Sequence, residues 1–380
     1  MTKFNLSEDY LNKCSDTVAA TPHEHLPVRY AITCRRGGMM CGVADIVDLL
    51  NDHCNGPLTL RGKADGERFA AGEVVLVLEG PFGELVPLET LCGGILSLSA
   101  AAANMAELVE AAGDSIRIID TSARRYPPEL IGPVAIAAAV GGARGTNTQA
   151  GQTAVLERFG VGGDQIRVGS RPQVSFGLYG SVPRVLDVMY GGEGVEAAEA
   201  LHRACSYTSL TVRAGAEGRE RDVLTEAVRR FGSALESVRL DTPPDRMHQG
   251  GHEKPTRTLE MRILSQAGDR AAAQAALERY GFGPGVTIEM VYAVRDLLDS
   301  LGGRYTKITV GDGFDIEKIR AWRTCNAPVD FIEVDDWVDF GEFTSELVAV
   351  QEEGHWVARR PTGSTTELII PEDLPVIVQR

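Results

Sequence analysis

The sequence predicts an α/β protein with an α/β barrel in its middle and a second sheet shared by its two ends. Val-rich, strand-like runs lie at 26–33 and 73–80 near the N-terminus, and such runs are typical of buried strands. Strand-then-helix units repeat between about 116 and 334, which favours parallel pairing through right-handed crossovers. Strand-like stretches return near the C-terminus as SELVAV, HWVARR and TELII.

The first hundred residues mix strand and helix signals. Between the two strands, Gly42 to Leu50 has the pattern of a short amphipathic helix. The segment 85–113 is long, apolar and rich in alanine, which predicts a helix. It has a weak point at Gly93–Gly94, and Gly113 is its expected C-cap. We expect these elements to form an N-terminal domain over residues 1–112.

The repeated units supply the strands of the predicted barrel over residues 113–340. A series of this length is enough for a closed or nearly closed barrel, in which chemistry lies at the C-terminal strand ends. The last segment, 341–380, has to pair somewhere, and joining the N-terminal sheet is the simplest solution. The expected barrel strands lie at 116–121, 209–214, 237–241, 307–313 and 329–334, with helices near 127–140, 218–231 and 315–323.

Charge and composition argue against several classes of function. The net charge of −15 disfavours a polyanion such as nucleic acid as a partner. No uninterrupted apolar run reaches the ~20 residues of a membrane span, and the N-terminus has no apolar signal core, so we expect a cytoplasmic protein. The seven scattered cysteines form no C-x-x-C motif, which fits reduced thiols better than disulfides or a zinc ribbon.

Polar residues gather at the predicted strand ends. The first barrel strand is followed by Arg124 and Arg125, and the third supplies Arg239 and Asp241, with Arg246 just beyond. Guanidinium groups bind phosphate or carboxylate oxygens in a planar fork, and carboxylates can hold Mg²⁺. This combination suits a substrate with several phosphates and an anionic partner.

These motifs resemble those of the nicotinate phosphoribosyltransferases, particularly the shorter archaeal-type members, which are related to quinolinate phosphoribosyltransferase. The resemblance implies an N-terminal α/β sandwich, an atypical α/β barrel and a homo-oligomer. It also implies transfer of ribose 5-phosphate from phosphoribosyl pyrophosphate to a pyridine or related aromatic carboxylic acid, a step of NAD biosynthesis, with Mg²⁺. The matching segments, in family order, are PLETLCGGILSLS, DTSARRYPP, GGARGTNTQAG, GSVPRVLD, VRLDTPPDR and VGDGFD.

The resemblance also implies roles for individual residues. The catalytic candidates are Arg125, Asp241 and Glu333, and Asp241 would also bind Mg²⁺ beside the ribose. The substrate-binding candidates lie in or near the same motifs: Arg124, Arg125, Gly141, Gly142, Thr146, Arg171, Arg184, Arg239, Arg246, Asp312 and Asp335.

Two departures from the family pattern bear on function. Arg184 stands where family members carry a catalytically phosphorylated histidine. Asp312, Glu333, Asp335 and Asp336 stand where the family has its phosphate-binding cradle, and carboxylates there would repel a phosphate. Three interpretations stay open: a phosphoribosyltransferase, a divergent enzyme whose ligand lacks the 5-phosphate, and a non-catalytic binding protein on the same scaffold.

Ordinary structural roles are the alternatives for single residues. Arg124 and Arg125 would also suit a surface or interface ion-pair patch, and Asp241 would suit the N-cap of a turn. His248 and His252 share the i, i+4 spacing of a helix, but the two glycines between them favour a loop over a metal site.

Overall fold

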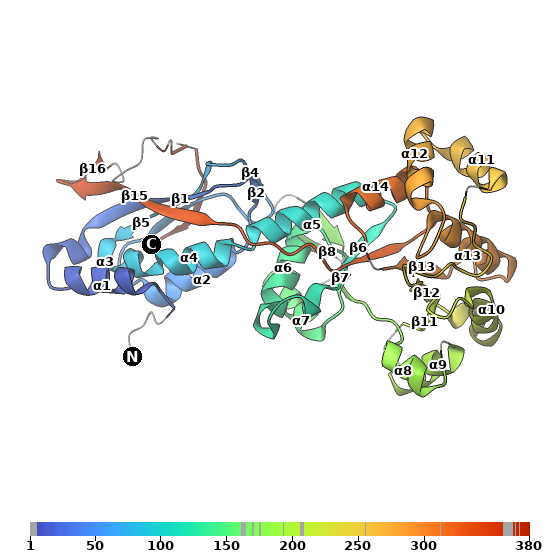
Figure 1. Cartoon of the computed structure of the whole chain (residues 1–380). Helices are drawn as coiled ribbons and strands as arrows, with labels where there is room; N and C mark the ends of the chain where they lie inside the picture. The colour runs from blue at the N-terminus through green and yellow to red at the C-terminus, as the bar shows by residue number, and fades with distance from the viewer. Residues whose placement is uncertain are drawn as a thin grey trace.

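The computed structural model describes residues 6–160, 165–168, 171–174, 176–192, 194–205, 209–254, 256–311, 313–359, 368, 370–371 and 373–380, with the backbone alone for 165–168 and 171–174. The molecule is elongated, with a sheet domain at one end and a barrel-like domain at the other (Figure 1). The described residues nearest to both ends of the chain lie in the sheet domain, and the middle of the chain forms the barrel-like domain.

The sheet domain contains a six-stranded sheet in the order β16-β15-β1-β5-β3-β17. Strands β15, β16 and β17 come from the C-terminal part of the chain, which confirms that this part returns to the N-terminal sheet. The stretch TELII lies mainly outside the described residues. The strands are β1 (Pro27–Cys34), β3 (Thr59–Gly62), β5 (Val74–Pro81), β15 (Phe343–Glu352), β16 (His355–Ala358) and β17 (Val376–Gln379).

Helices cover one face of this sheet (Figure 1). The core between them contains Ile32 of β1, Leu76 of β5, Ile46 and Leu96, all of which are buried. These side chains come from strand positions that face the helices and from the apolar stripes of the helices themselves. The covering elements are α1 (Asp9–Val18), α2 (Val43–His53), α3 (Phe82–Leu85) and α4 (Glu89–Leu96), with 3₁₀ turns at Pro22–His25 and Val86–Leu88. A separate ladder joins β2 (Gly38–Met39) to β4 (Arg68–Phe69).

The long helix expected over 85–113 is divided into separate elements. Helix α4 ends at Leu96 and α5 (Ser99–Ala112) follows, so the break lies after the glycine pair rather than at it. The Ser97 hydroxyl donates to the Gly94 carbonyl at 2.7 Å, and the Ser97 carbonyl accepts from the Gly341 N–H at 2.7 Å. These bonds close the last turn of α4. Gly113 caps α5 with a φ of 66°.

Helix α5 joins the two domains. It packs against β2 on one side and against α6 (Ile131–Gly141) and α14 (Ile316–Thr324) on the other. By length and composition the helical stretch Phe82–Ala112 would suit a membrane span, but half of its apolar window is buried inside the protein. Packing of this stretch in the core of the sheet domain and against the half-barrel domain therefore accounts for its apolar character.

The second domain is built on a seven-stranded parallel sheet in the order β10-β7-β6-β14-β13-β12-β11. The sheet curls into a half-barrel, which confirms the atypical α/β barrel that we expected. Within the described residues no pairing joins β10 to β11, so closure of the barrel is not seen there. Two short helices, α8 (Arg184–Met189) and α9 (Val195–Ala204), lie between these strands in the sequence. The strands are β6 (Arg117–Asp120), β7 (Gly145–Thr146), β10 (Gly177–Leu178), β11 (Thr211–Ala214), β12 (Ser237–Leu240), β13 (Lys307–Val310) and β14 (Phe331–Val334).

Helices cover the outer face of the half-barrel, where the strands present Val212, Val238, Ile308 and Ile332, all fully buried. The opposite face is polar, because Arg213 of β11 lies in register with Arg239 of β12. A β8–β9 hairpin (Gln165–Val168, Arg171–Val174) lies apart from both sheets. The remaining helices are α7 (Gln149–Phe159), α8 (Arg184–Met189), α9 (Val195–Ala204), α10 (Glu220–Phe231), α11 (Arg257–Gln266), α12 (Arg270–Tyr280) and α13 (Ile288–Ser300).

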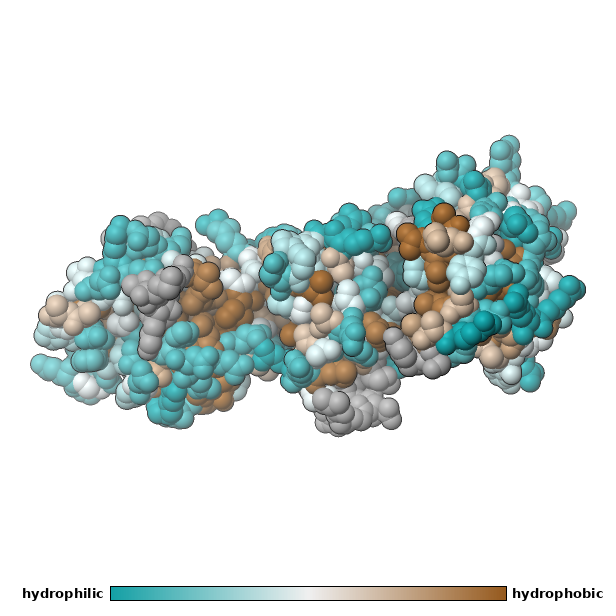
Figure 2. Space-filling view, turned by 90° about the horizontal axis from the view of Figure 1, so that it is seen from below, coloured by the Kyte–Doolittle hydropathy of each residue, from teal (hydrophilic) through white to brown (hydrophobic). Residues whose placement is uncertain are grey.

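Helix α8 leaves an apolar outer surface. Val185, Val188 and Met189 are 74%, 71% and 80% exposed, whereas Asp187 is buried. Figure 2 views the molecule from the side on which α8 lies in Figure 1, and apolar patches interrupt the polar surface of the half-barrel domain there. The buried residue of α8 is therefore a charged one, Asp187.

Glu89 occupies an apolar environment in the sheet domain. It is half-buried at the start of α4, beside a small cavity. Burial, with a smaller contribution from the negative charge of Glu8, raises the pKa of Glu89 to about 6. The other residues lining the cavity are Tyr30, Ile32, Leu78, Leu85, Leu88, Cys92 and Ser345.

We expect Glu89→Gln to flatten the pH dependence of stability in mildly acidic solution. The folded carboxyl holds its proton up to a pKa of about 6, against an ordinary value of 4.5. Wild-type stability should therefore decrease as pH rises through this window, because the folded state binds more protons there than the unfolded state. Denaturant unfolding at pH 4.5, 5.5 and 7 measures the slope. Glu107→Gln, on the exposed side of α5, is the control, and equal slopes for Glu89→Gln and wild type would contradict the prediction.

Candidate functional site

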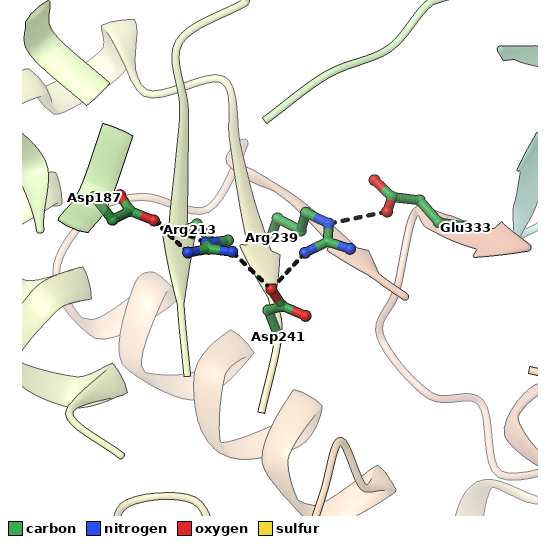
Figure 3. Close-up of polar contacts among 5 residues, drawn as sticks. All are labelled: Asp187, Arg213, Arg239, Asp241 and Glu333. Carbon is green, nitrogen blue, oxygen red and sulfur yellow. Dashed lines mark hydrogen bonds and ion pairs between the residues drawn. The ribbon is translucent and has the colours of Figure 1, made fainter. Parts of the chain in front are cut away.

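Five charged side chains form a continuous chain of ion pairs across one side of the half-barrel (Figure 3). Asp187 of α8 accepts a hydrogen bond from Arg213 Nε at 2.9 Å. Arg213 Nη1 reaches Asp241 Oδ2 at 2.9 Å, and Arg239 Nη1 lies 2.9 Å from the same oxygen. Arg239 Nε then donates to Glu333 Oε2 of β14 at 2.9 Å. The charges alternate in sign along the chain.

The sheet register explains why this chain forms. Arg213 and Arg239 lie side by side on neighbouring strands, where two bare cations would repel each other. Asp241 directly follows β12, and its backbone N–H donates to the Ala214 carbonyl at 2.9 Å, which fixes its position. Its Oδ2 atom accepts from both guanidinium groups, so a single carboxylate compensates both cations.

Gly311 provides the space for the next pair. It directly follows β13, between β12 and β14. A Cβ at this position would lie 2.9 Å from Arg239 Nη2 and 3.1 Å from Glu333 Oε2. The Arg239–Glu333 ion pair therefore passes over the chain at Gly311, directly after β13, where no side chain occupies the space.

Burial makes the pairing necessary. The side chains of Asp187 and Arg213 are 4% and 6% exposed, and those of Arg239, Asp241 and Glu333 are 14% exposed. Removing one member of a buried pair leaves a charge that is costly to keep out of water. Burial raises the pKa of Asp187, and Arg213 opposes this rise. Asp187 Oδ1 is buried with no hydrogen-bond partner in the described part of the chain.

A second, more exposed pair lies at the neighbouring strand end. Arg125 follows β6 and its Nη2 donates to Asp335 Oδ2 at 2.8 Å, with Asp336 at 3.9 Å from Nη1. The Arg125 side chain is 49% exposed, so this pair contributes little to stability. Arg124 is exposed and has no ion pair within the described residues. The C-terminal strand ends thus carry Asp241, Glu333 and Arg125, the three residues expected to be catalytic.

The loop that follows Asp241 is held by two buried carboxylates. Glu220 accepts the backbone N–H of Gln249 at 2.9 Å, and Glu289 accepts that of His252 at 2.9 Å. His252 Nδ1 also contacts Glu289 Oε1 at 2.6 Å. The two histidines of this segment thus lie in a loop, as expected. Arg246 lies in the same loop, and its guanidinium donates to the Ala216 carbonyl after β11.

Three of the expected substrate-binding residues have structural contacts instead of joining the cluster. Gly141 lets α6 approach α5, because a Cβ there would lie 2.6 Å from the Ala102 carbonyl oxygen. Gly142 caps α6 with a φ of 101°. Both lie where the chain enters β7, at the opposite strand ends from Asp241. Thr146 is buried on the outer face, and its hydroxyl donates to Asp120 Oδ2 at 3.1 Å.

The remaining candidates are less closely defined. Arg184 is exposed at the first residue of α8, on the same short helix as Asp187. Arg171 begins strand β9, where only the backbone is described. Asp312 lies outside the described residues, directly after Gly311.

Arg213 and Asp187 were missed by the sequence reasoning. A signal for Arg213 was present, because TVRA and SVRL carry arginine at the same place in two consecutive strands. Asp187 lies one helical turn after Arg184 and is buried, whereas Arg184 is exposed, and only the tertiary structure shows that Asp187 faces the half-barrel.

The cluster does not form a metal site by itself. Among the residues that the structure describes, no group of three or more His, Cys, Asp or Glu side chains is placed to share a metal ion. Asp241, the expected Mg²⁺ ligand, has its Oδ2 atom engaged by two arginines. Mg²⁺ often binds through one or two carboxylates together with substrate phosphates, so a role for Mg²⁺ would depend on a phosphorylated ligand.

Replacing Gly311 by alanine tests the crowding at this point. The added methyl group would meet Arg239 Nη2 at 2.9 Å and Glu333, and we expect a loss of about 1–3 kcal/mol in the free energy of unfolding. Gly94→Ala is the control, because nothing lies within 4 Å of its Cβ position in α4. Denaturant unfolding measures both, and equal stability of Gly311→Ala and wild type would show that the pair is not confined.

Comparisons with known proteins agree with this architecture. Residues 16–99 match the family model of the quinolinate phosphoribosyl transferase N-terminal domain. The nicotinate-nucleotide pyrophosphorylase of Pyrococcus furiosus superposes with a TM-score of 0.65 at 20% identity, over 95% of this chain and 81% of that one. Human nicotinic acid phosphoribosyltransferase gives 0.55 at 14% identity, over 91% and 75%.

A bacterial structure extends the likeness over a complete chain. NadC from Streptococcus pyogenes superposes with a TM-score of 0.55 at 16% identity, over 93% of this chain and 99% of that one. No curated protein is similar enough in sequence to match. Likenesses at identities this low show the fold of this chain. The reaction has to be argued from the residues of the site. The sheet domain, the parallel half-barrel and these likenesses together show that the chain has the type II phosphoribosyltransferase fold.

Proposed function

We propose that the protein is a phosphoribosyltransferase that transfers ribose 5-phosphate from phosphoribosyl pyrophosphate to a pyridine or related aromatic carboxylic acid. The main support is the ion-paired cluster of Asp241, Arg239 and Glu333 at the C-terminal strand ends. In barrel enzymes this edge carries the active site. The fold supports the same class, since the solved structures that share it include a nicotinate-nucleotide pyrophosphorylase and a nicotinic acid phosphoribosyltransferase.

In the proposed reaction, the bond between ribose C1 and the pyrophosphate oxygen breaks, and its electron pair leaves with pyrophosphate. The ring nitrogen of the acceptor supplies the electron pair for the new C1–N bond. Positive charge builds on the ribose ring in between, and the Asp241 and Glu333 carboxylates are placed to stabilise it. Arg125 and Arg124, at the neighbouring strand end, would hold an acceptor carboxylate or a phosphate in line.

The proposal includes further statements, which rest partly on the resemblance and partly on charge and composition. Mg²⁺ would be held beside the ribose by Asp241 together with the phosphates of the donor. The protein would act as a homo-oligomer on small anionic substrates and would not bind nucleic acid. It would be cytoplasmic, for which the support is that the described cysteines form no disulfide with one another.

Asp241→Asn should lower kcat/KM for pyrophosphate release by about 100-fold or more, because it removes a negative charge beside the reacting carbon. The assay supplies phosphoribosyl pyrophosphate and Mg²⁺ with nicotinate or quinolinate. Asp339→Asn is the control, since Asp339 is also ion-paired, to Arg36, but lies outside the cluster. The proposal fails if wild type releases no pyrophosphate with either acceptor, or if Asp241→Asn retains the wild-type rate.

A second candidate is an enzyme of the same fold whose ligand lacks the 5-phosphate. The observation that favours it is the pairing of Glu333 with Arg239 and of Asp335 with Arg125. These carboxylates neutralise the arginines that would otherwise bind a phosphate, and they present acceptors for ribose hydroxyls or an amine. A non-catalytic binding protein on this scaffold would use the same contacts without turnover.

Calorimetry separates these candidates. If the carboxylates exclude the 5-phosphate, wild type should bind phosphoribosyl pyrophosphate with Mg²⁺ only weakly and bind an unphosphorylated nucleoside more tightly. The double variant Glu333→Gly and Asp335→Gly should then gain about tenfold or more in affinity for the phosphorylated donor, because two repulsive charges are removed. Micromolar binding of that donor by wild type, followed by pyrophosphate release, would eliminate the second candidate.

A further inference from the structure

We propose that Arg213 and Asp187 are positioning residues, which hold the Asp241 carboxylate in the orientation that the reaction needs. The kinetic test of this inference rests on the proposed function, but the structural argument for it does not. Its structural basis is the part of the ion-pair chain that lies deepest in the protein, and neither residue was among the candidates from the sequence.

The contacts of Arg213 show that it acts on other protein groups. All three of its guanidinium nitrogens lie against carboxylates: Nε and Nη2 contact Asp187, and Nη1 contacts Asp241 at 2.9 Å. Its side chain is only 6% exposed. A guanidinium that is both enclosed and fully engaged is poorly placed to bind a ligand directly. It is well placed to fix the direction of Asp241.

Arg239 alone would not fix Asp241, because it divides its contacts between Asp241 and Glu333. A ligand that draws Glu333 away would also move Arg239. Arg213 supplies a second hydrogen bond to Asp241 Oδ2 from the opposite side, and it is anchored on a different element. The two arginines together hold the carboxylate from both sides.

Asp187 anchors Arg213, and it is a buried residue of the short helix α8. The neighbouring residues Val185, Val188 and Met189 face outward, so the Asp187–Arg213 pair is a main polar attachment of α8 to the half-barrel. Its Oδ1 atom has no partner within the described residues. A buried carboxylate oxygen without a hydrogen bond is unfavourable, and Asp187 bears this cost while its Oδ2 atom holds Arg213.

The test compares Arg213→Lys and Asp187→Asn with wild type. Lysine keeps the charge but loses the fork that contacts two carboxylates. We expect kcat for pyrophosphate release to fall about tenfold or more in Arg213→Lys, since small displacements of reacting groups are costly. KM for the acceptor should change less than about threefold. Asp187→Asn should lower kcat in the same direction, and the double variant should be no worse than Arg213→Lys alone, since both changes act through one contact.

A matched control separates positioning from simple loss of stability. Arg29→Lys alters an ion pair with Glu79 inside the sheet domain, where the atoms lie 2.6 Å apart, and it should leave kcat unchanged. If Arg213→Lys is folded and turns over at the wild-type rate, the proposal is wrong. A drop in melting temperature with no change in kcat per folded molecule would also overturn it.

A ligand-free readout distinguishes failure of this inference from failure of the proposed function. The side-chain carboxyl ¹³C resonance of Asp241, assigned with Asp241→Asn, can be observed without substrate. It should shift in Asp187→Asn, because Arg213 donates hydrogen bonds to both carboxylates. If wild type proves inactive with every donor, a shift still supports the positioning role, and an unchanged resonance refutes it.

Discussion

One oxygen atom, Oδ2 of Asp241, holds together the charged edge of the half-barrel. The parallel register places Arg213 and Arg239 next to each other on adjacent strands, and this oxygen accepts a hydrogen bond from each. The other contacts of the cluster follow from the need to compensate these two neighbouring positive charges. Glu333 compensates the charge of Arg239 that Asp241 leaves uncompensated, and Gly311 leaves the space in which Glu333 and Arg239 meet. Asp187 binds Arg213 at the guanidinium nitrogens that do not contact Asp241.

The two ends of the strands have different tasks. At the end where the strands begin, Gly141 and Gly142 serve helix packing and a helix cap. At the end where the strands finish, charged residues contact one another across the sheet. This division is a general property of parallel sheets covered by helices, because the loops after strands are free to carry side chains inward while the loops before strands follow the packed helices. It also explains why glycines close together in sequence do not all serve a ligand.

Much of the fold could be predicted from the sequence, because alternating strand and helix patterns are local. The strand ends that carry Asp241, Glu333 and Arg125 could be identified in the same way. The ion-pair partners of these residues could not be predicted from the sequence, because the pairs Asp187–Arg213 and Arg239–Glu333 depend on the order and register of the strands. The order β14-β13-β12-β11 sets which strands are neighbours, and Glu333 is 94 residues from Arg239 along the chain.

The return of the C-terminal strands has a consequence for how the chain folds. Strand β15 pairs with β1 and β17 pairs with β3, so the N-terminal sheet is complete only when the last residues are present. The strands of the half-barrel all lie in the middle of the sequence. During synthesis the half-barrel is therefore complete before the C-terminal strands are made, and it is available to fold first. The first strands meanwhile expose unpaired edges, and edges of this kind are the usual starting point for aggregation. Truncation at the C-terminus would thus leave the sheet domain incomplete, although the residues removed lie far in sequence from most of it.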